Sequence, residues 1–217
     1  MGLEAQEMTD RLLRALEREG PVFITVEISP YALEFRAKQA SYYRTILREN
    51  LKKIQGEDGM SYRCFLSRGE ILGIFLLLKA PFEWKAAEAF AEKRKVGLKA
   101  IDLSAFSEEK LACISELIDP DNLRALLRNS SPSIDSQVGW KYKRAQTLWN
   151  STAVAGFISE EVQQRERHMA GEIRRLMEKS HKGKMLHVGG WEHLLPAPQG
   201  KSLYERLQEF RPRRILL

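Results

Sequence analysis

The sequence contains little cysteine, and it has no long hydrophobic run. Its two cysteines, Cys64 and Cys113, lie far apart and show neither the spacing of a metal site nor a disulfide framework. The longest apolar stretch, Ile71 to Leu78, is far too short to cross a bilayer as a helix. Residues 1–19 also lack the basic region and apolar core of a secretory signal. These absences predict a soluble, reduced, cytoplasmic protein without a membrane span.

The length and composition are those of an ordinary globular domain. The chain has 217 residues, of which 43% are hydrophobic, so we expect a single α/β domain over residues 1–217 with a helical insertion around residues 104–152. Lysine and arginine total 35 against 29 acidic residues. This basic excess is dispersed, and no recognised nucleic-acid-binding motif accompanies it, so we do not expect a nucleic-acid partner.

Strand and helix patterns alternate along the chain. Amphipathic helical spacing, beginning with residues 3–18, separates short β-branched or apolar runs. This alternation predicts a mainly parallel sheet flanked by helices. The predicted strands cover residues 22–28, 98–103, 185–188 and 214–217.

One aromatic and basic region, residues 135–152, has two interpretations. Its interleaved tryptophans and cations could stack bases or bind phosphate. The spacing of Trp140, Arg144, Leu148 and Trp149 favours instead a helix whose apolar face holds the two tryptophans.

Polar residues stand where three of the predicted strands end. Glu27 and Asp102 fall at two strand ends, and His193 follows the Gly189-Gly190 pair after the third strand. Because the carboxyl ends of parallel strands meet at one edge of a sheet, we expect these side chains to converge there. Each also has a structural alternative: Asp102 can cap the following helix, and a histidine after a turn is often structural. His187, on the strand itself, is most simply a core residue.

A charged group also interrupts the apolar stripe of the helix before the third strand. Steps of four and three residues from Val162 reach Glu166, Met169, Ile173 and Leu176, so Glu166 is the one acidic member of the stripe. Arg165 lies beside it, where it can pair with Glu166 or with Glu27.

These pieces resemble, in order, the superfamily that contains TraB pheromone-shutdown proteins, ChaN-like haem-binding lipoproteins, Tiki metalloproteases and erythromycin esterases. The valine-glutamate strand end of that superfamily resembles residues 22–27, and its isoleucine-aspartate strand end resembles residues 98–102. Its Arg-acid-x-x-Met-Ala helix resembles residues 165–170, and its Gly-x-x-His element resembles residues 190–193. The resemblance is scattered over nearly the whole chain. It implies a hydrolase or a haem-binding protein.

The chain departs from this superfamily at its beginning. Members usually carry a first Gly-x-x-His or Gly-Glu-x-His strand shortly before the valine-glutamate strand, whereas here residues 3–18 form a helical pattern without a histidine. Either the first strand precedes residue 1 or the chain is a degenerate member. Any activity that needs two histidine motifs is therefore in question, and the missing strand would leave a sheet edge open to homodimerisation.

The predicted catalytic residues are Glu27, Arg165, Glu166 and His193. A carboxylate with an imidazole can act as a general base on water, and His193 with Glu27 could also hold a divalent metal or haem iron. Three classes of function stay open: a hydrolase-like enzyme, a binding module for haem or another anionic ligand, and an interaction protein. A small molecule or a peptide would be the ligand of the first two.

Overall fold

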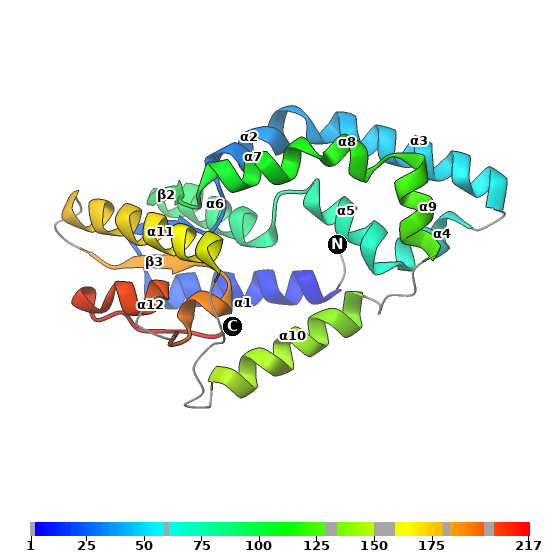
Figure 1. Cartoon of the computed structure of the whole chain (residues 1–217). Coiled ribbons are helices and arrows are strands. Elements are labelled where there is room, and N and C mark those ends of the chain that lie inside the picture. Colours follow the sequence, from blue (N-terminus) through cyan, green and yellow to red (C-terminus); the bar gives the residue numbers. More distant parts are fainter. Residues whose placement is uncertain (1–2, 59–60, 129–133, 150–158, 180–182, 198–201) are drawn as a thin grey trace. The chain divides into compact units, whose positions relative to one another are not determined.

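The computed structural model describes residues 3–58, 61–128, 134–149, 159–179, 183–197 and 202–217. It has the predicted α/β fold: helices form most of it, and three short strands make one parallel sheet (Figure 1). The chain divides into two compact units, of which the first comprises residues 1–30, 81–103 and 145–217 and the second residues 31–80 and 104–144. That the two units form one domain stays a prediction.

The first unit contains the sheet and every predicted site residue. Its strands confirm three of the predicted ones: the third has the predicted bounds, whereas the first two are shorter than predicted. The predicted N-terminal helix is also present. In chain order its elements are α1 (Leu3–Glu19), β1 (Phe23–Val26), α6 (Phe82–Arg94), β2 (Gly97–Ala100), α11 (Glu160–Lys179), β3 (Met185–Val188), the 3₁₀ helix η1 (Trp191–Leu194), α12 (Leu203–Arg206) and the 3₁₀ helix η2 (Gln208–Phe210).

The sheet has the strand order β2-β1-β3, so β1 lies in the centre and pairs in parallel with both neighbours. At the carboxyl end of the ladder, Val26 is paired with Ala100 and with Val188. The pairing continues one residue further, because the backbone N–H of Glu27 donates to the carbonyl of Val188 at 2.8 Å. Glu27 therefore lies at the middle of the carboxyl edge, where ligands of parallel sheets usually bind.

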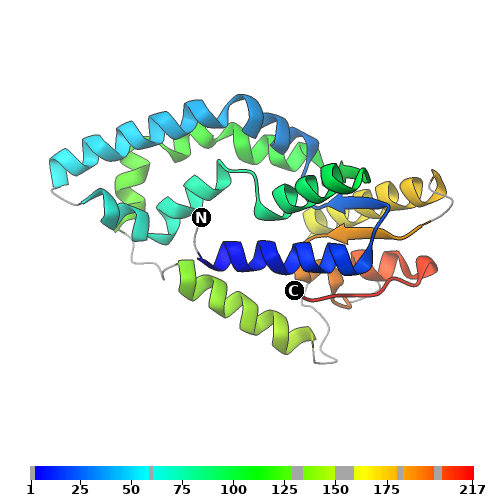
Figure 2. The same ribbon diagram turned by 180° about the vertical axis from the view of Figure 1, so that it is seen from behind.

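The two faces of the sheet have different coverings. Figures 1 and 2 show α1 and α11 on opposite sides of the strands. Side chains alternate along a strand, so Thr25 and Glu27 point to one face while Ile24 and Val26 point to the other. The Thr25 face is the α11 face, because Lys99, which is paired with Thr25 in the register, forms a 2.5 Å ion pair with Glu172 of α11.

Helix α11 forms where the amphipathic spacing predicted it. Glu166, Met169, Ala170 and Ile173 are all buried, as expected for one stripe of a helix. The apolar members join Ile101, just beyond β2, and two leucines that follow in the chain in one core cluster. This packing fixes the rotation of α11, and so fixes where Arg165 and Glu166 point.

The prediction of a strand at residues 214–217 is wrong. Residues 211–217 are irregular, and Arg211 adopts a left-handed φ of 50°. Arg214 is held by its side chain: its guanidinium lies over the rings of Trp149 and Tyr204 and donates to the carbonyl of Leu194 at 2.9 Å. The apolar run that follows packs beside α1 instead of joining the sheet.

The second unit is helical in all its described parts. Its elements are α2 (Pro30–Lys38), α3 (Ala40–Asp58), α4 (Tyr62–Ser67), α5 (Gly69–Leu77), α7 (Ser104–Ala112), α8 (Ile114–Leu117), α9 (Pro120–Arg128) and the first part of α10 (Ile134–Trp149). The predicted insertion at residues 104–152 is helical in α7 to α10, and residues 150–152 lie outside the described residues.

Helix α10 confirms the helical interpretation of the aromatic and basic region, but its tryptophans are not on one buried face. Trp140 is 59% exposed and lies beside Arg144, whose guanidinium is 5.2 Å from the ring centroid. Trp149 is half-buried under Arg214. Trp140 therefore lies on the exposed side of the helix, next to a charged neighbour.

Candidate functional site

Glu27 lies at the centre of a hydrogen-bonded cluster at the carboxyl edge of the sheet. Its Oε1 accepts a hydrogen bond from Arg165 Nη2 at 2.8 Å and is 2.7 Å from His193 Nε2. Its Oε2 accepts from the backbone N–H of Gly190 at 2.6 Å. Both oxygens are therefore fixed, one by charged side chains and the other by the turn that follows β3.

Arg165 joins two strand ends to α11. Its Nε donates to Asp102 Oδ1 at 2.9 Å and its Nη2 donates to Asp102 Oδ2 at 2.8 Å, which is the two-pronged geometry that guanidinium and carboxylate groups favour. Asp102 Oδ1 also accepts from the N–H of Leu103 at 2.8 Å. The structure thus confirms the predicted pairing of Arg165 with Glu27, adds Asp102 as its stronger partner, and shows no such pair with Glu166.

His193 lies between two carboxylates. Besides Glu27 on Nε2, its Nδ1 is 2.5 Å from Glu166 Oε1. His193 is 7% exposed and Glu166 is 2% exposed, so both are buried. The Gly189-Gly190 turn and η1 carry His193 back over the strand end to reach α11. The four predicted site residues therefore meet in one cluster, with Asp102 as its fifth member.

The cluster fixes the charge of its members. Burial alone would raise the pKa of Glu27, but the hydrogen bond from His193 and the charges of His193 and Arg165 outweigh it and lower that pKa to about 2. Burial alone would lower the pKa of His193, yet its hydrogen bonds to Glu166 and Glu27 raise it to about 10. At neutral pH the pair is an ionised carboxylate beside an imidazolium. The hydrogen bond to Asp102 raises the pKa of Arg165 further above its usual high value.

The sequence analysis missed His187 as a site residue. Its ring Nδ1 lies 3.0 Å from Oγ1 of Thr25, its fully buried partner across the β1–β3 pair. Its Nε2 is buried and has no hydrogen-bond partner among the described residues. Burial lowers the pKa of His187 to about 4, so the ring is neutral at pH 7. The register could have found it, because residues 25, 27 and 187 share one face of the sheet.

Glu83, in the first turn of α6, is a second residue that the sequence analysis missed. Burial raises the pKa of its carboxyl group, and the negative charge of Glu27 raises it further. Glu83 follows Phe82 at a helix start, a position where acidic residues are common for structural reasons, so the pattern gave no functional signal.

The two glycines after β3 differ in how closely other atoms approach them. A Cβ atom on Gly189 would lie 2.8 Å from His187 Nε2 and 2.9 Å from Glu27 Oε2. A Cβ on Gly190 would lie 3.3 Å from Glu27 Oε2 and 3.4 Å from His193 Cδ2, which is tight but tolerable. The prediction of a close backbone approach after the third strand is confirmed, and Gly189 is the stricter position.

The predicted metal role of His193 and Glu27 meets an obstacle in this geometry. The two groups contact each other at 2.7 Å, and the second nitrogen of His193 is bonded to Glu166, so neither ring nitrogen is open to a divalent ion or to haem iron. Among the residues that the structure describes, no group of three histidine, cysteine or acidic side chains could hold a metal ion. As folded, these side chains fit an acid–base cluster, and a metal or haem ligand role for them stays a prediction.

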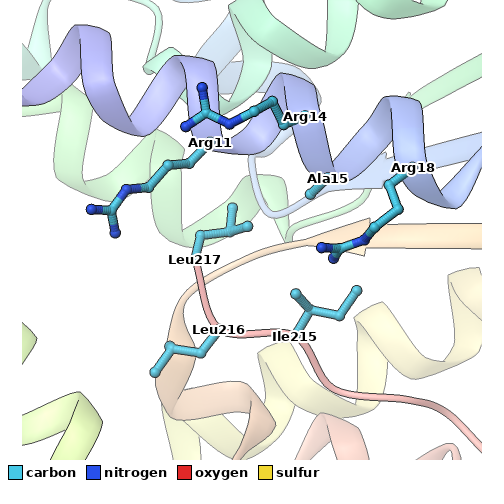
Figure 3. A pocket seen from close by; sticks show the side chains of 7 residues that line it. All are labelled: Arg11, Arg14, Ala15, Arg18, Ile215, Leu216 and Leu217. Atoms are coloured by element: carbon cyan, nitrogen blue, oxygen red, sulfur yellow. The ribbon is translucent and has the colours of Figure 1, made fainter.

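A separate groove of about 520 Å³ runs beside α1 (Figure 3). Three arginines of α1 and three apolar residues of the C-terminal run face it: Arg11, Arg14, Arg18, Ile215, Leu216 and Leu217. Two of the arginines are also paired with acidic neighbours, Arg11 with Glu7 and Arg18 with Glu19. None of the predicted site residues lines this groove.

Comparisons with protein-family models, with curated proteins and with solved structures find no match to this chain. The resemblance to the TraB and ChaN superfamily therefore stays a prediction, carried by residues 22–27, 98–102, 165–170 and 190–193. None of the described helices is both long and apolar enough to span a membrane.

Proposed function

We propose that this chain is a TraB- and ChaN-like α/β protein that acts as a hydrolase through the cluster at the carboxyl edge of its sheet. The observation that carries this proposal is the position of His193, a buried imidazole bonded at both nitrogens to carboxylates. Such an arrangement keeps an ionised Glu27 beside an imidazolium, and an ionised carboxylate can accept a hydrogen bond from a water molecule and orient it for attack.

In this proposal each side chain has one role. Glu27 orients the attacking water through Oε2, which faces the Gly189 turn. His193 is the cation that keeps Glu27 ionised and in place, through its bonds to Glu27 and Glu166. Arg165 is a positioning residue, because it holds Glu27 through Oε1 and locks Asp102 beside it.

The test is a panel of p-nitrophenyl esters and p-nitrophenyl phosphate with the full chain. We expect hydrolysis of at least one probe, and a loss of about 100-fold or more in kcat for Glu27→Gln, the size typical of general acid–base groups. Glu172→Gln is the matched control, since Glu172 lies on the same face and pairs with Lys99 outside the cluster. Wild-type protein that releases no nitrophenol above buffer from any probe contradicts the proposal.

A second candidate function is a non-catalytic module for ligand binding or interaction. The observation in its favour is that Glu27, Asp102 and Arg165 already bond to one another and to the backbone, as in a purely structural ion network. Metal and haem content of the purified protein, by elemental analysis and absorbance, tests the binding form. About one equivalent of metal or haem, lost in folded His193→Ala and Glu27→Ala proteins, supports the binding form. Absence of both metal and haem after reconstitution leaves the interaction form.

A further inference from the structure

We propose that the groove beside α1 docks a partner protein through an extended acidic peptide, whose acidic side chains pair with the arginines of α1 and whose backbone pairs with residues 215–217. The groove lies entirely within the first compact unit. No residue of the Glu27 cluster lines it, so this inference goes beyond the proposed hydrolase function and does not depend on it.

The wall that α1 gives to the groove carries a row of positive charge. Arg11, Arg14 and Arg18 line the groove, and no acidic side chain of the described residues does (Figure 3). Their spacing of three and four residues places them on one face of the helix, where a rise of 1.5 Å per residue spreads them over about 10 Å. A ligand with a single negative charge would use only part of this row. The row therefore favours a ligand with several negative charges along its length.

Glu19 does not balance the charge at one end of this row. It bonds to Arg18 at 3.1 Å, to Lys184 at 3.0 Å and also to Arg213. One carboxylate is thus shared by three cations, and the side chains of all three cations are more than half exposed. The remaining positive charge attracts an anionic partner to this end of the groove.

Arg14 is the cation of the row that is available to such a partner. It is exposed and makes no hydrogen bond or ion pair with the described residues. Asp10, one turn earlier, accepts a hydrogen bond from Gln6 at 3.0 Å instead, and Arg11 pairs with Glu7 at 2.6 Å. A carboxylate that enters the groove can therefore bond to Arg14 without first displacing another carboxylate.

The C-terminal run gives the groove a second kind of binding group, its backbone. Residues 215–217 are half-buried and irregular, and their N–H and C=O groups make no hydrogen bond with the described residues. A segment with unpaired backbone groups can accept a strand from another chain, and the main-chain hydrogen bonds then supply affinity. Side chains alternate along a strand, so every second side chain of the added peptide would face α1. We expect aspartate or glutamate at these positions.

The uncharged lining of the groove distinguishes a peptide from a nucleic acid. It is aliphatic, and consists of Ala15, Ile215, Leu216 and Leu217. Sites for single-stranded nucleic acid add aromatic side chains, on which the bases stack, to a row of cations. None of the described lining residues is aromatic. Aliphatic residues bury aliphatic side chains instead, so the lining favours a peptide in which acidic and apolar residues alternate.

The test is fluorescence anisotropy of a fluorescein-labelled octapeptide, in which glutamate and leucine alternate, titrated with the full chain. The control peptide has the same composition but carries its glutamates and leucines in pairs, so that one face of the extended peptide no longer holds all the acids. We expect saturable binding of the alternating peptide, about fivefold or more tighter than that of the control peptide and weaker at high salt.

Arg14→Gln tests the row of charge, because it removes a cation without breaking a bond to the described residues. We expect the variant to bind the alternating peptide about fivefold more weakly, the upper end for an exposed ion pair. Arg48→Gln is the matched control, since Arg48 is an exposed arginine of α3 that also makes no bond with the described residues. It should leave the affinity unchanged. Circular dichroism checks that both variants are folded, as expected for exposed positions.

Three results would overturn the proposal directly: no saturable binding of the alternating peptide, equal affinity for the two peptides, or equal affinity of Arg14→Gln and wild type. An oligothymidine that binds as tightly as the alternating peptide and displaces it would also overturn the proposal and assign the groove to nucleic acid. A dimer that the peptide dissociates, seen by light scattering, would assign the groove to a second copy of this chain. The hydrolase proposal is decided separately, by its own assay.

Discussion

His193 determines the ionisation of the cluster because it bonds to Glu27 and Glu166 at once. Replacing His193 leaves the carboxyl groups of Glu27 and Glu166 in the site without the cation that they share. Breaking a buried charge pair in this way costs about 3–5 kcal/mol of folding free energy. A variant of His193 must therefore be shown to be folded before its loss of function is attributed to chemistry.

The stability of the protein should fall as the pH rises above neutrality. The pKa of His193 is raised from 6.5 to about 10, so its contribution is fully present below pH 6.5 and lost as the pH rises through 10. The pKa of Glu27 is lowered from 4.5 to about 2, so its contribution is present above pH 4.5 and lost as the pH falls through 2. Together they contribute most between pH 4.5 and 6.5.

Urea unfolding of wild-type protein and of His193→Gln over pH 6.5 to 10 checks whether stability falls as the pH rises. We expect the free energy of unfolding of the wild type to fall toward that of the variant by up to about 1.4 kcal/mol per pH unit, the limit for one proton. Parallel pH profiles for the two proteins would contradict it.

Arg165 should not tolerate lysine. Its two nitrogens bond to both oxygens of Asp102, and one of them also bonds to Glu27, which a single ammonium cannot reproduce. We expect Arg165→Lys to lose about 1.5–3 kcal/mol of unfolding free energy. Arg175→Lys, on the exposed side of the same helix, should change it by less than about 0.5 kcal/mol. Equal losses of unfolding free energy for Arg165→Lys and Arg175→Lys in chemical denaturation would show that the two-pronged geometry contributes nothing.

The sequence was sufficient to predict the members of the cluster but not all of their bonds. Glu27, Asp102 and His193 follow from strand ends, and Glu166 from its place on a buried stripe. The choice of partner for Arg165 depends on how α11 is rotated, which packing decides. His187 was missed because the sequence of an apolar run does not show whether both ring nitrogens of a histidine within it have hydrogen-bond partners.

At the scale of elements, three strands and the long helices were predictable because each has a clear period or a β-branched run. The final apolar residues, Ile215 to Leu217, are too few to show a period. The sequence therefore does not distinguish a strand from an extended segment packed on a helix. The segment is irregular and pairs with none of the three strands, and its Arg214 contacts Trp149 and Tyr204, which are tertiary contacts that the sequence does not show.

Alanine substitutions at two glycines, Gly97 of β2 and Gly171 of α11, should change the free energy of unfolding in opposite directions. Phe23 lies over Gly97, where an added Cβ would be 2.2 Å from the ring. Gly97→Ala should therefore lower the free energy of unfolding by about 1–3 kcal/mol through overpacking. Gly171→Ala, on the exposed side of α11 with nothing near its Cβ position, should raise it by about 0.5–1 kcal/mol. Guanidinium titration of both variants checks the pair, and a stabilised Gly97→Ala contradicts the packing.

At the scale of the whole molecule, the sheet has two outer strands, β2 and β3, and neither pairs with a further strand among the described residues. Open edges favour association with a second copy. We expect a homodimer whose fraction rises with concentration, measured by size-exclusion chromatography with multi-angle light scattering. A constant monomer mass at every concentration would contradict this expectation.

The position of β1 has a consequence for synthesis on the ribosome. This strand is made well before one of its two partners, β3: Thr25 and His187 are 162 residues apart. While the residues between them are made, β1 has one side unpaired, and neither the ladder nor the Glu27–His193 contact can close until β3 and η1 have emerged. We expect such long-range closure to slow folding and to leave the unpaired edge of β1 exposed to association in the interval.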